Sequence, residues 1–360
     1  MNFLFLNSAR RGWGGNEKWT RLAAESLAEE HGVFLAYRDP RLAERFTVRS
    51  FRLPFKAEVD LVTLFMLTRI IRREKIDVLI PTKRKDYVLA GLASRICGIS
   101  NILRLGIDRP LKNTFLHKLV YSIWSDGIIV NADKIRLTLL QTAWISPEKI
   151  RVIYNGLDRT SLDINANERT WNKPFIFTIT SAGALIPRKG FDFLIRSFSR
   201  FIQNHPDTGA GLVIMGDGPE LSRLKQLAAL LGIAERVVFT GFVDNPYPVL
   251  KQSDVYVAAS TSEGISNALI EAMYFGCVPI STEAGGTKEM IGNGENGFLV
   301  QFGNDQQLSS LFGTLYNSPE MRRKIGSTAK TTIRKAFSTE VMTKELLEFC
   351  VMQTSAKNNV

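Results

Sequence analysis

Two glutamates, Glu263 and Glu271, stand eight residues apart and could act on an anionic or hydroxyl-rich ligand. Glu263 lies just before a predicted helix, which Ser266 or Asn267 can cap and Gly276 can end. The start of a helix carries N–H groups without helical partners and a partial positive charge. This stretch therefore predicts a place for a phosphate beside a carboxylate.

Glu271 falls one turn inside this helix, in the apolar run Ala268-Leu269-Ile270-Glu271-Ala272-Met273. A carboxylate in such surroundings needs a partner, because burial of an unpaired charge is costly. The hydroxyl groups of a ribose would serve. Spacing alone leaves the opposite interpretation open, with Glu271 facing solvent and Glu263 an ordinary loop acid.

Lys189 is a third candidate, placed after a predicted strand and directly before a helix that opens at Gly190-Phe191-Asp192. In open α/β sheets ligands bind at the carboxyl ends of the strands, and this placement points the amine there. The alternative for Lys189 is a solvated surface charge.

Strands and helices alternate along the chain, which predicts parallel sheets with helices on both faces. The predicted strands are 2–6, 33–37, 78–80, 102–105, 127–130, 151–154, 175–179, 211–215, 237–240, 255–258 and 278–281. Helical periodicity covers 17–30, 61–75, 87–97, 191–203, 220–231 and 339–350.

A chain of 360 residues exceeds the usual size of one hydrophobic core, so we expect two domains. The polar stretch 159–173 lacks periodicity and is interpreted as a linker. The expected organisation is an N-terminal acceptor-side domain over 1–158 and a donor-binding domain over 174–336. A C-terminal helix and frayed tail complete it over 337–360.

Several short motifs occur in one order along the chain. They are Gly14-Gly15, Val152-Ile153-Tyr154-Asn155-Gly156-Leu157-Asp158, Pro187-Arg188-Lys189-Gly190, Gly216-Asp217-Gly218-Pro219-Glu220, Gly241-Phe242-Val243, Glu263 with Glu271, Gly285-Gly286 and Phe337-Ser338-Thr339-Glu340. Together they resemble the retaining glycosyltransferases of the family 4 type (glycosyl transferases group 1). The resemblance covers nearly the whole second half and patches of the first.

The resemblance implies an α/β GT-B fold, in which two Rossmann-like doubly wound domains face a central cleft and the C-terminal helix can cross back to the N-terminal domain. It implies that Glu271 holds the donor ribose, Glu263 contacts the transferred sugar near the reacting carbon, and Lys189 neutralises the diphosphate. The remaining implied donor-binding residues are Gly14, Gly15, Arg188, Gly264, Ile265, Ser266 and Asn267. Each glycine by itself also fits an ordinary turn.

The chain departs from the family pattern in two places. The family usually has an Arg five residues before the Lys, where this chain has Ala184. Arg188 could replace it, although adjacent side chains usually diverge. Many members also place a His after a middle strand of the first domain, where this chain has none. Arg104, on that strand, is therefore a candidate contact for the donor or an anionic acceptor.

By resemblance the chain moves a sugar from a nucleotide-sugar donor to a glycan or lipid-linked acceptor with retention of configuration. Cell-envelope polysaccharide or lipopolysaccharide biosynthesis is the expected setting. No acidic metal-binding motif accompanies the predicted site, so we expect no metal and no cofactor, the nucleotide sugar being a substrate. A non-catalytic nucleotide-sugar-binding protein of the same fold and a nucleotide-sugar epimerase remain open.

The net charge of +11 is concentrated in the first half, where residues 1–158 hold 26 Lys and Arg against 16 Asp and Glu. Such a surplus suits an anionic membrane surface or an acidic substrate, and no nucleic-acid-binding motif accompanies it. A solvated basic surface is the alternative. Two groups mix basic and apolar residues. They are Arg38, Arg41, Arg45, Arg49, Arg52 and Lys56 with Phe46, Phe51, Leu53 and Phe55, and Arg69, Arg72, Arg73 and Lys75 after Leu64-Phe65-Met66-Leu67.

No apolar run approaches the roughly 20 residues that span a bilayer. The apolar start is followed by Arg10 and Arg11, an order that is wrong for a secretory signal. The three cysteines are widely spaced and form no disulfide or zinc pattern. The expected location is the cytoplasm, with peripheral attachment to the inner face of the cytoplasmic membrane.

Overall fold

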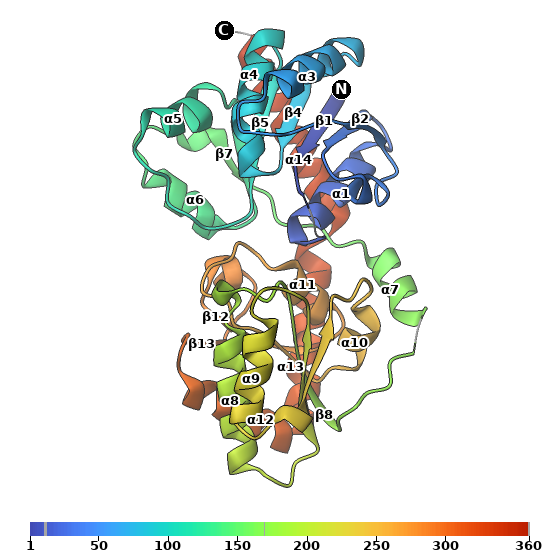
Figure 1. The fold of residues 1–360 in the computed structure, drawn as a ribbon, viewed down its shortest axis with the longest axis vertical. Coiled ribbons are helices and arrows are strands. Elements are labelled where there is room, and N and C mark those ends of the chain that lie inside the picture. The colour runs from blue at the N-terminus through green and yellow to red at the C-terminus, as the bar shows by residue number, and fades with distance from the viewer. Residues whose placement is uncertain (11–12, 169, 359–360) are drawn as a thin grey trace. The chain divides into compact units, whose positions relative to one another are not determined.

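The computed structural model describes residues 1–10, 13–168 and 170–358, and the chain divides into two compact units (Figure 1). Unit 1 comprises Met1–Gly156 together with the segment from Thr339 onward, and unit 2 comprises Leu157–Ser338. Each unit contains one parallel sheet with helices packed on it. Two Rossmann-like domains are therefore confirmed, and the C-terminal helix crosses back to the first of them.

In unit 1 the described strands form a seven-stranded sheet in the order β3-β2-β1-β4-β5-β6-β7. The strands are β1 (Asn2–Asn7), β2 (Gly32–Tyr37), β3 (Arg49–Arg52), β4 (Val78–Pro81), β5 (Ser100–Leu105), β6 (Gly127–Val130) and β7 (Ile150–Val152). The α-helices are α1 (Gly15–Leu27), α2 (Pro40–Ala43), α3 (Leu61–Arg73), α4 (Tyr87–Cys97), α5 (Phe115–Lys118), α6 (Asp133–Leu140) and α14 (Thr339–Asn358). Short helical turns are η1 (Arg84–Asp86), η2 (Leu119–Ile123) and η3 (Pro147–Lys149).

The central strand β1 is apolar on both sides because helices cover both faces of its sheet. Phe3 and Phe5 pack in one cluster with Trp19 of α1 and Phe349 of α14. The alternate residues Leu4 and Leu6 belong to a second cluster with α3 and α4: that cluster includes Leu67, Ile70, Ile71, Leu89 and Ala90. The C-terminal helix thus supplies part of the core of unit 1.

Unit 2 has a six-stranded sheet in the order β10-β9-β8-β11-β12-β13. Its strands are β8 (Phe177–Ala182), β9 (Ala210–Met215), β10 (Val237–Gly241), β11 (Val255–Ala258), β12 (Val278–Thr282) and β13 (Phe298–Val300). Its α-helices are α7 (Arg159–Asn167), α8 (Phe191–Asn204), α9 (Leu221–Leu230), α10 (Tyr247–Gln252), α11 (Asn267–Tyr274), α12 (Asp305–Asn317) and α13 (Pro319–Ala336), with turns η4 (Pro187–Lys189), η5 (Ala234–Arg236) and η6 (Gly285–Glu289). The core gathers Phe177, Phe198, Phe201 and Phe312.

The structure differs from the sequence prediction at three kinds of place. Strands β3 and β13 were missed because both are short strands at the sheet edges: β3 is the polar segment RSFR, and β13 has only the three residues FLV. The stretch expected to be an irregular linker contains α7, which Asp158 caps by accepting the N–H of Ser161 at 3.0 Å. The tail expected to fray continues α14 as far as Asn358, where Lys357 donates to Asp126 at 3.0 Å.

Candidate functional site

Lys189 and Arg188 lie at the carboxyl end of β8, in η4. Gly190 follows with a left-handed φ of +65°, and a Cβ there would lie 2.1 Å from the carbonyl oxygen of Ala259. Only glycine allows this close approach between η4 and the segment after β11. Thr261 in that segment donates its N–H to the carbonyl of Arg188 at 2.8 Å. The backbone therefore fixes where the two basic side chains start.

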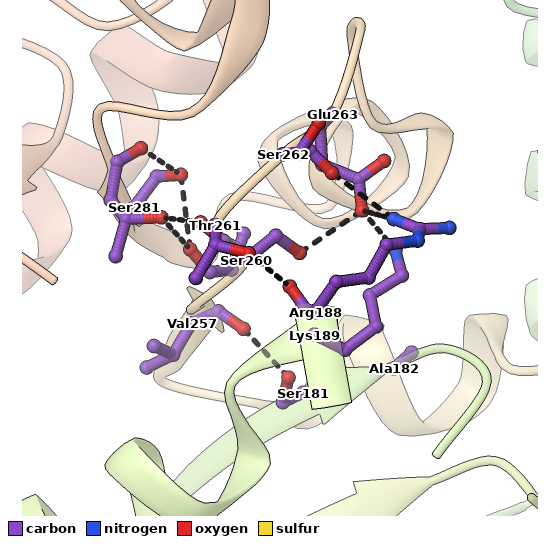
Figure 2. Close-up of polar contacts among 12 residues, drawn as sticks. Ser181, Ala182, Arg188, Lys189, Val257, Ser260, Thr261, Ser262, Glu263 and Ser281 are labelled. Carbon is purple, nitrogen blue, oxygen red and sulfur yellow. Dashed lines mark hydrogen bonds and ion pairs between the residues drawn. The ribbon is translucent and has the colours of Figure 1, made fainter. Parts of the chain in front are cut away.

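Both basic side chains end on one carboxylate oxygen, as Figure 2 shows. Arg188 Nη1 lies 3.1 Å from Oε1 of Glu263 and 3.1 Å from the carbonyl oxygen of Ser262. Lys189 Nζ forms a second ion pair with the same Oε1. The expectation that the adjacent side chains would diverge was wrong, because the tight turn at η4 lets both reach the same loop.

Ser260 is the third donor on this oxygen, and sequence reasoning missed it. Its hydroxyl donates to Oε1 of Glu263 at 3.0 Å, and its side chain is buried. The available signal was position, since Ser260 comes just after a predicted strand and three residues before the glutamate. Three donors on one oxygen make a compact charge cluster at the carboxyl edge of the sheet.

The pKa of Glu263 reflects this crowding. Burial favours the neutral acid, but the charges of Lys189 and Arg188 and the hydrogen bonds outweigh burial. The pKa of Glu263 therefore lies below its usual value. The group is a carboxylate at neutral pH, and in the free protein it neutralises cations that an anionic ligand could claim.

A second close approach holds the loop that carries Glu263. Gly285 has a φ of +59°, and a Cβ there would lie 2.1 Å from the carbonyl oxygen of Glu263. Gly286 donates its N–H to the carbonyl of Gly264 at 2.9 Å. The loop is thus held from two sides, by η4 and by η6, and opens into a small pocket. The pocket is lined by Ala258, Ser260, Glu263, Gly264, Ile265, Ser266, Leu269, Ser281, Ala284, Thr287 and Met290.

Helix α11 starts at this pocket. Ser266 is its N-cap residue with extended backbone, and its side chain makes no capping hydrogen bond. Of the predicted donor-binding residues in this loop, Gly264, Ile265 and Ser266 line the pocket. Glu271 is 5% exposed on α11 and does not belong to the pocket lining, so solvent exposure, the alternative for this residue, is excluded.

In unit 1, the first loop brings Gly14 and Gly15 to the start of α1. Gly14 caps the helix with its own backbone, and its N–H donates to the carboxylate of Glu17 at 3.2 Å. Glu17 also forms an ion pair with Lys83. The predicted approach of this backbone to a phosphate would therefore meet a carboxylate already at the helix start. Arg11 and Gly12, in the same loop, lie outside the described residues.

Arg104, on β5, is buried with an exposed fraction of 4%. Its guanidinium donates to the amide oxygen of Asn16 at 2.7 Å and to that of Asn155 at 3.2 Å. It also lies 4.6 Å from the ring centroid of Trp19, a cation–π distance. Burial lowers the pKa of Arg104 to about 10, so the group stays cationic at neutral pH.

Two protein families match this chain, one over most of unit 1 and the other over most of unit 2. The family described as Glycosyltransferase Family 4 matches residues 13–161, and the one described as Glycosyl transferases group 1 matches residues 166–332. The putative glycosyltransferase EpsD of Bacillus subtilis is 33% identical over 340 residues, covering 89% of this chain and 88% of EpsD. This chain belongs to the family 4 glycosyltransferases. It has their GT-B fold.

Two further relatives have more specific names. The lipopolysaccharide core biosynthesis glycosyltransferase LpsE of Rhizobium meliloti is 28% identical, with 77% of this chain and 76% of LpsE covered. A Campylobacter jejuni enzyme, N-acetylgalactosamine-N,N'-diacetylbacillosaminyl-diphospho-undecaprenol 4-alpha-N-acetylgalactosaminyltransferase, is 31% identical. That match covers 66% of this chain and 63% of the relative, which is less than two thirds of the relative's length.

Among solved structures, Anabaena Alr3699/HepE in complex with UDP-glucose superposes with a TM-score of 0.81. Its sequence is 20% identical, and the match covers 97% of this chain and 98% of that one. At this identity the likeness speaks for the fold of this glycosyltransferase. Its site chemistry rests on the residues described above.

Among the described residues, no three His, Cys, Asp or Glu side chains gather where they could hold a metal ion. Positive charge beside the pocket comes from Lys189 and Arg188, which pair with Glu263 in its lining, and from the start of α11. Ala184, which stands where the family usually has an Arg, is exposed.

Proposed function

We propose that this glycosyltransferase transfers a sugar from a nucleotide-sugar donor to a glycan or lipid-linked acceptor with retention of configuration. The observation that carries the proposal is the cluster of Lys189, Arg188 and Glu263 beside the start of α11. A donor diphosphate needs cations and N–H groups, and both converge on this pocket. The complex of HepE with UDP-glucose supports a nucleotide sugar as the donor.

Transfer requires that charge on the departing diphosphate be stabilised. In the free protein Glu263 holds Lys189 and Arg188. We expect the diphosphate to take over these cations and the start of α11, while the released Glu263 contacts the transferred sugar. Fixed cations and helix N–H groups stabilise charge most effectively when they are already in place.

The proposed reaction breaks the bond between the anomeric carbon and the donor phosphate oxygen, and forms a bond to the acceptor oxygen on the same face. The acceptor hydroxyl loses its proton to the departing phosphate. Glu271 would hold the ribose, and Gly14, Gly15 and Asn267 would lie near the donor through their backbone. Arg104 remains a candidate contact for the donor or for an anionic acceptor.

The reaction should need no divalent ion, because Lys189, Arg188 and α11 supply the positive charge. We expect turnover to be unchanged in excess chelator. The measurement is the initial rate with and without chelator, followed by added magnesium or manganese. Loss of turnover in chelator and its return with either metal would contradict this part of the proposal.

The acceptor is proposed to belong to cell-envelope glycan biosynthesis, as a lipopolysaccharide core or a lipid-linked saccharide. The names of the R. meliloti and C. jejuni relatives support this class. Within the described residues no helix has the length and apolar character to cross a membrane. We also propose that the enzyme reaches a lipid-linked acceptor by peripheral attachment to the inner face of the cytoplasmic membrane, to which the basic surplus of the first half is suited.

The decisive experiment first screens nucleotide sugars for thermal stabilisation of the enzyme and then tests the best donor with envelope glycan acceptors. Product NMR should show the donor's anomeric configuration in the new bond. Inversion would contradict retention. A changed sugar formed from the donor alone would indicate an epimerase, and tight donor binding without turnover on any acceptor would indicate a non-catalytic binder.

A further inference from the structure

Helix α3 exposes large apolar side chains on the side that faces away from the core of unit 1. Its buried residues Leu67, Ile70 and Ile71 recur at helical spacing and pack in the core with α4. The exposed apolar residues, here called the α3 crown, are Val59 at 58%, Leu61 at 74%, Val62 at 56% and Phe65 at 68% exposure. They gather at the first turns of the helix and just before it.

An ordinary surface helix turns polar residues outward. Helix α8 does so, with a buried apolar face and with Arg196 and Arg200 exposed. Scattered exposed apolar residues need no explanation, but a contiguous group marks an interaction site. The α3 crown is such a group, and we therefore interpret it as an interaction site.

The backbone of the crown is held by hydrogen bonds. The exposure of its apolar side chains is therefore not caused by fraying of the helix end. Asp60 caps α3 by accepting the N–H groups of Val62 at 3.2 Å and Thr63 at 3.3 Å. It also accepts the Thr63 hydroxyl at 2.6 Å and the N–H of Lys56 at 2.9 Å. These hydrogen bonds, led by the one from the Thr63 hydroxyl, lower the pKa of Asp60. The backbone on both sides of the crown is therefore anchored.

Basic residues flank the crown. Between residues 56 and 73, all of which the structure describes, the exposed charged residues are Lys56, Glu58, Arg69, Arg72 and Arg73. Arg73 is paired with Glu74. The surroundings are therefore cationic, which favours an anionic partner over a neutral one.

The other mixed group of basic and apolar residues does not present a comparable surface. Phe46, Leu53 and Phe55 are buried in the core of unit 1, and Phe51 is half-buried. The apolar residues of this group therefore do not share a surface with their basic neighbours. Their alternation with arginine reflects packing of β3 and the loops around it.

We propose that the α3 crown inserts into the interfacial region of an anionic lipid bilayer, while Lys56, Arg69 and Arg72 contact the headgroups. An apolar face ringed by Lys and Arg is what binds at such an interface, where apolar burial and attraction to anionic lipid add together. The inference rests on the proposed function only in that a lipid-linked acceptor would be met at this surface. Transfer to a soluble acceptor does not depend on it.

The test measures cosedimentation of the full chain with vesicles of phosphatidylcholine alone and with phosphatidylglycerol added. Wild type should bind the anionic vesicles, and more weakly as salt rises. The double variant Leu61→Glu with Phe65→Glu should bind at least about tenfold more weakly, because two apolar side chains can no longer be buried. Its turnover on a soluble acceptor should equal that of wild type, which shows that the variant is folded.

The matched control is Ile176→Glu with Leu230→Glu, which changes two exposed apolar residues of unit 2 by the same charge. It should keep wild-type vesicle binding. An equal loss in both variants would overturn the proposal, since net charge alone would then explain attachment. The single variant Arg69→Gln should weaken binding about fivefold, and Arg200→Gln in unit 2 should not.

Insertion is distinguished from surface attraction by Phe65→Trp with brominated lipids, which quench tryptophan only at membrane depth. Its fluorescence, compared with that of wild type, should be quenched, whereas that of Leu230→Trp should not. Absence of quenching in Phe65→Trp would overturn insertion. So would a wild-type dimer in sedimentation that the Leu61→Glu, Phe65→Glu variant dissociates, because a second copy would then cover the crown. Failure of these assays with intact transfer to a soluble acceptor would remove membrane attachment from the proposed function and leave the proposed sugar transfer standing.

Discussion

The carboxyl edge of each sheet carries an arginine side chain, but the two guanidinium groups have different partners. In unit 2, Arg188 is partly exposed and shares the Glu263 carboxylate with Lys189. In unit 1, Arg104 is buried and donates to the amide oxygens of Asn16 and Asn155. A diphosphate can replace a carboxylate as counter-ion, whereas amide oxygens offer no charge to exchange. We therefore expect the cations of unit 2 to change partner when a diphosphate binds, and Arg104 chiefly to hold unit 1 together.

The largest effect should come from Lys189→Ala. If Lys189 stabilises the departing diphosphate, its loss should lower kcat by on the order of 10²–10³. Arg188→Ala should cost less, because the side chain of Arg188 is 30% exposed against 16% for Lys189. Steady-state kinetics on the full chain measure both. Lys225→Ala, which removes an exposed lysine from α9, is the control and should leave kcat unchanged. Wild-type turnover in Lys189→Ala would refute the assignment.

The two glutamates should separate binding from chemistry. Glu271→Ala should raise the Kd of free nucleotide by roughly 10- to 100-fold, the range for a lost hydrogen bond to a charged group. Glu263→Gln should chiefly lower kcat and leave nucleotide affinity near that of wild type. Calorimetric titration with the nucleotide and steady-state rates give the two values. Equal nucleotide affinity in wild type and Glu271→Ala would remove the ribose role.

Much of this site could be predicted from the sequence because it follows periodic elements. The strands β8, β11 and β12 were predicted close to their observed bounds, and Lys189 and Glu263 lie in the loops that follow the first two. Parallel strands end at one edge of their sheet, so the placement of Lys189 at that edge followed from the pattern. Residue spacing alone could not determine the tertiary contact itself, because the shared oxygen depends on the close approach at Gly190.

Other features needed three-dimensional packing. Ser260 looks like any loop serine until its hydroxyl is seen on Glu263. The α3 crown reads as part of an apolar helix, and only burial separates Leu67, which is inside, from Phe65, which is outside. The helix α7 escaped prediction because its segment is polar and packs on α10 with few apolar residues. In each case a tertiary partner decides what a local pattern leaves open.

A variant at Arg104 tests whether this residue stabilises unit 1 or contacts the donor. Arg104→Met removes the guanidinium that donates to the buried amide of Asn155 and the half-buried amide of Asn16, so the free energy of unfolding should fall by about 1–3 kcal/mol. The Kd of free nucleotide should stay at the wild-type value if unit 2 holds the donor without Arg104. Denaturant unfolding and calorimetry measure the two quantities. Unchanged stability together with weakened nucleotide binding would reverse the comparison and make Arg104 a donor contact.

The smallest expected effect comes from Ser260→Ala, which tests the ion cluster around Glu263 most directly. Ser260→Ala removes one hydrogen bond from the Glu263 carboxylate and should lower the free energy of unfolding at neutral pH by about 1 kcal/mol. The folded-state pKa of Glu263 lies below its unfolded value, so its contribution is present above the unfolded pKa and is lost as pH falls through the folded pKa. The difference between wild type and Ser260→Ala should therefore shrink on acidification. Ser281→Ala is the control, because the Ser281 hydroxyl donates to the backbone carbonyls of Ala258 and Thr282, and its cost should not vary with pH. Parallel pH profiles for the two variants would mean that Ser260 does not act through the ionised Glu263.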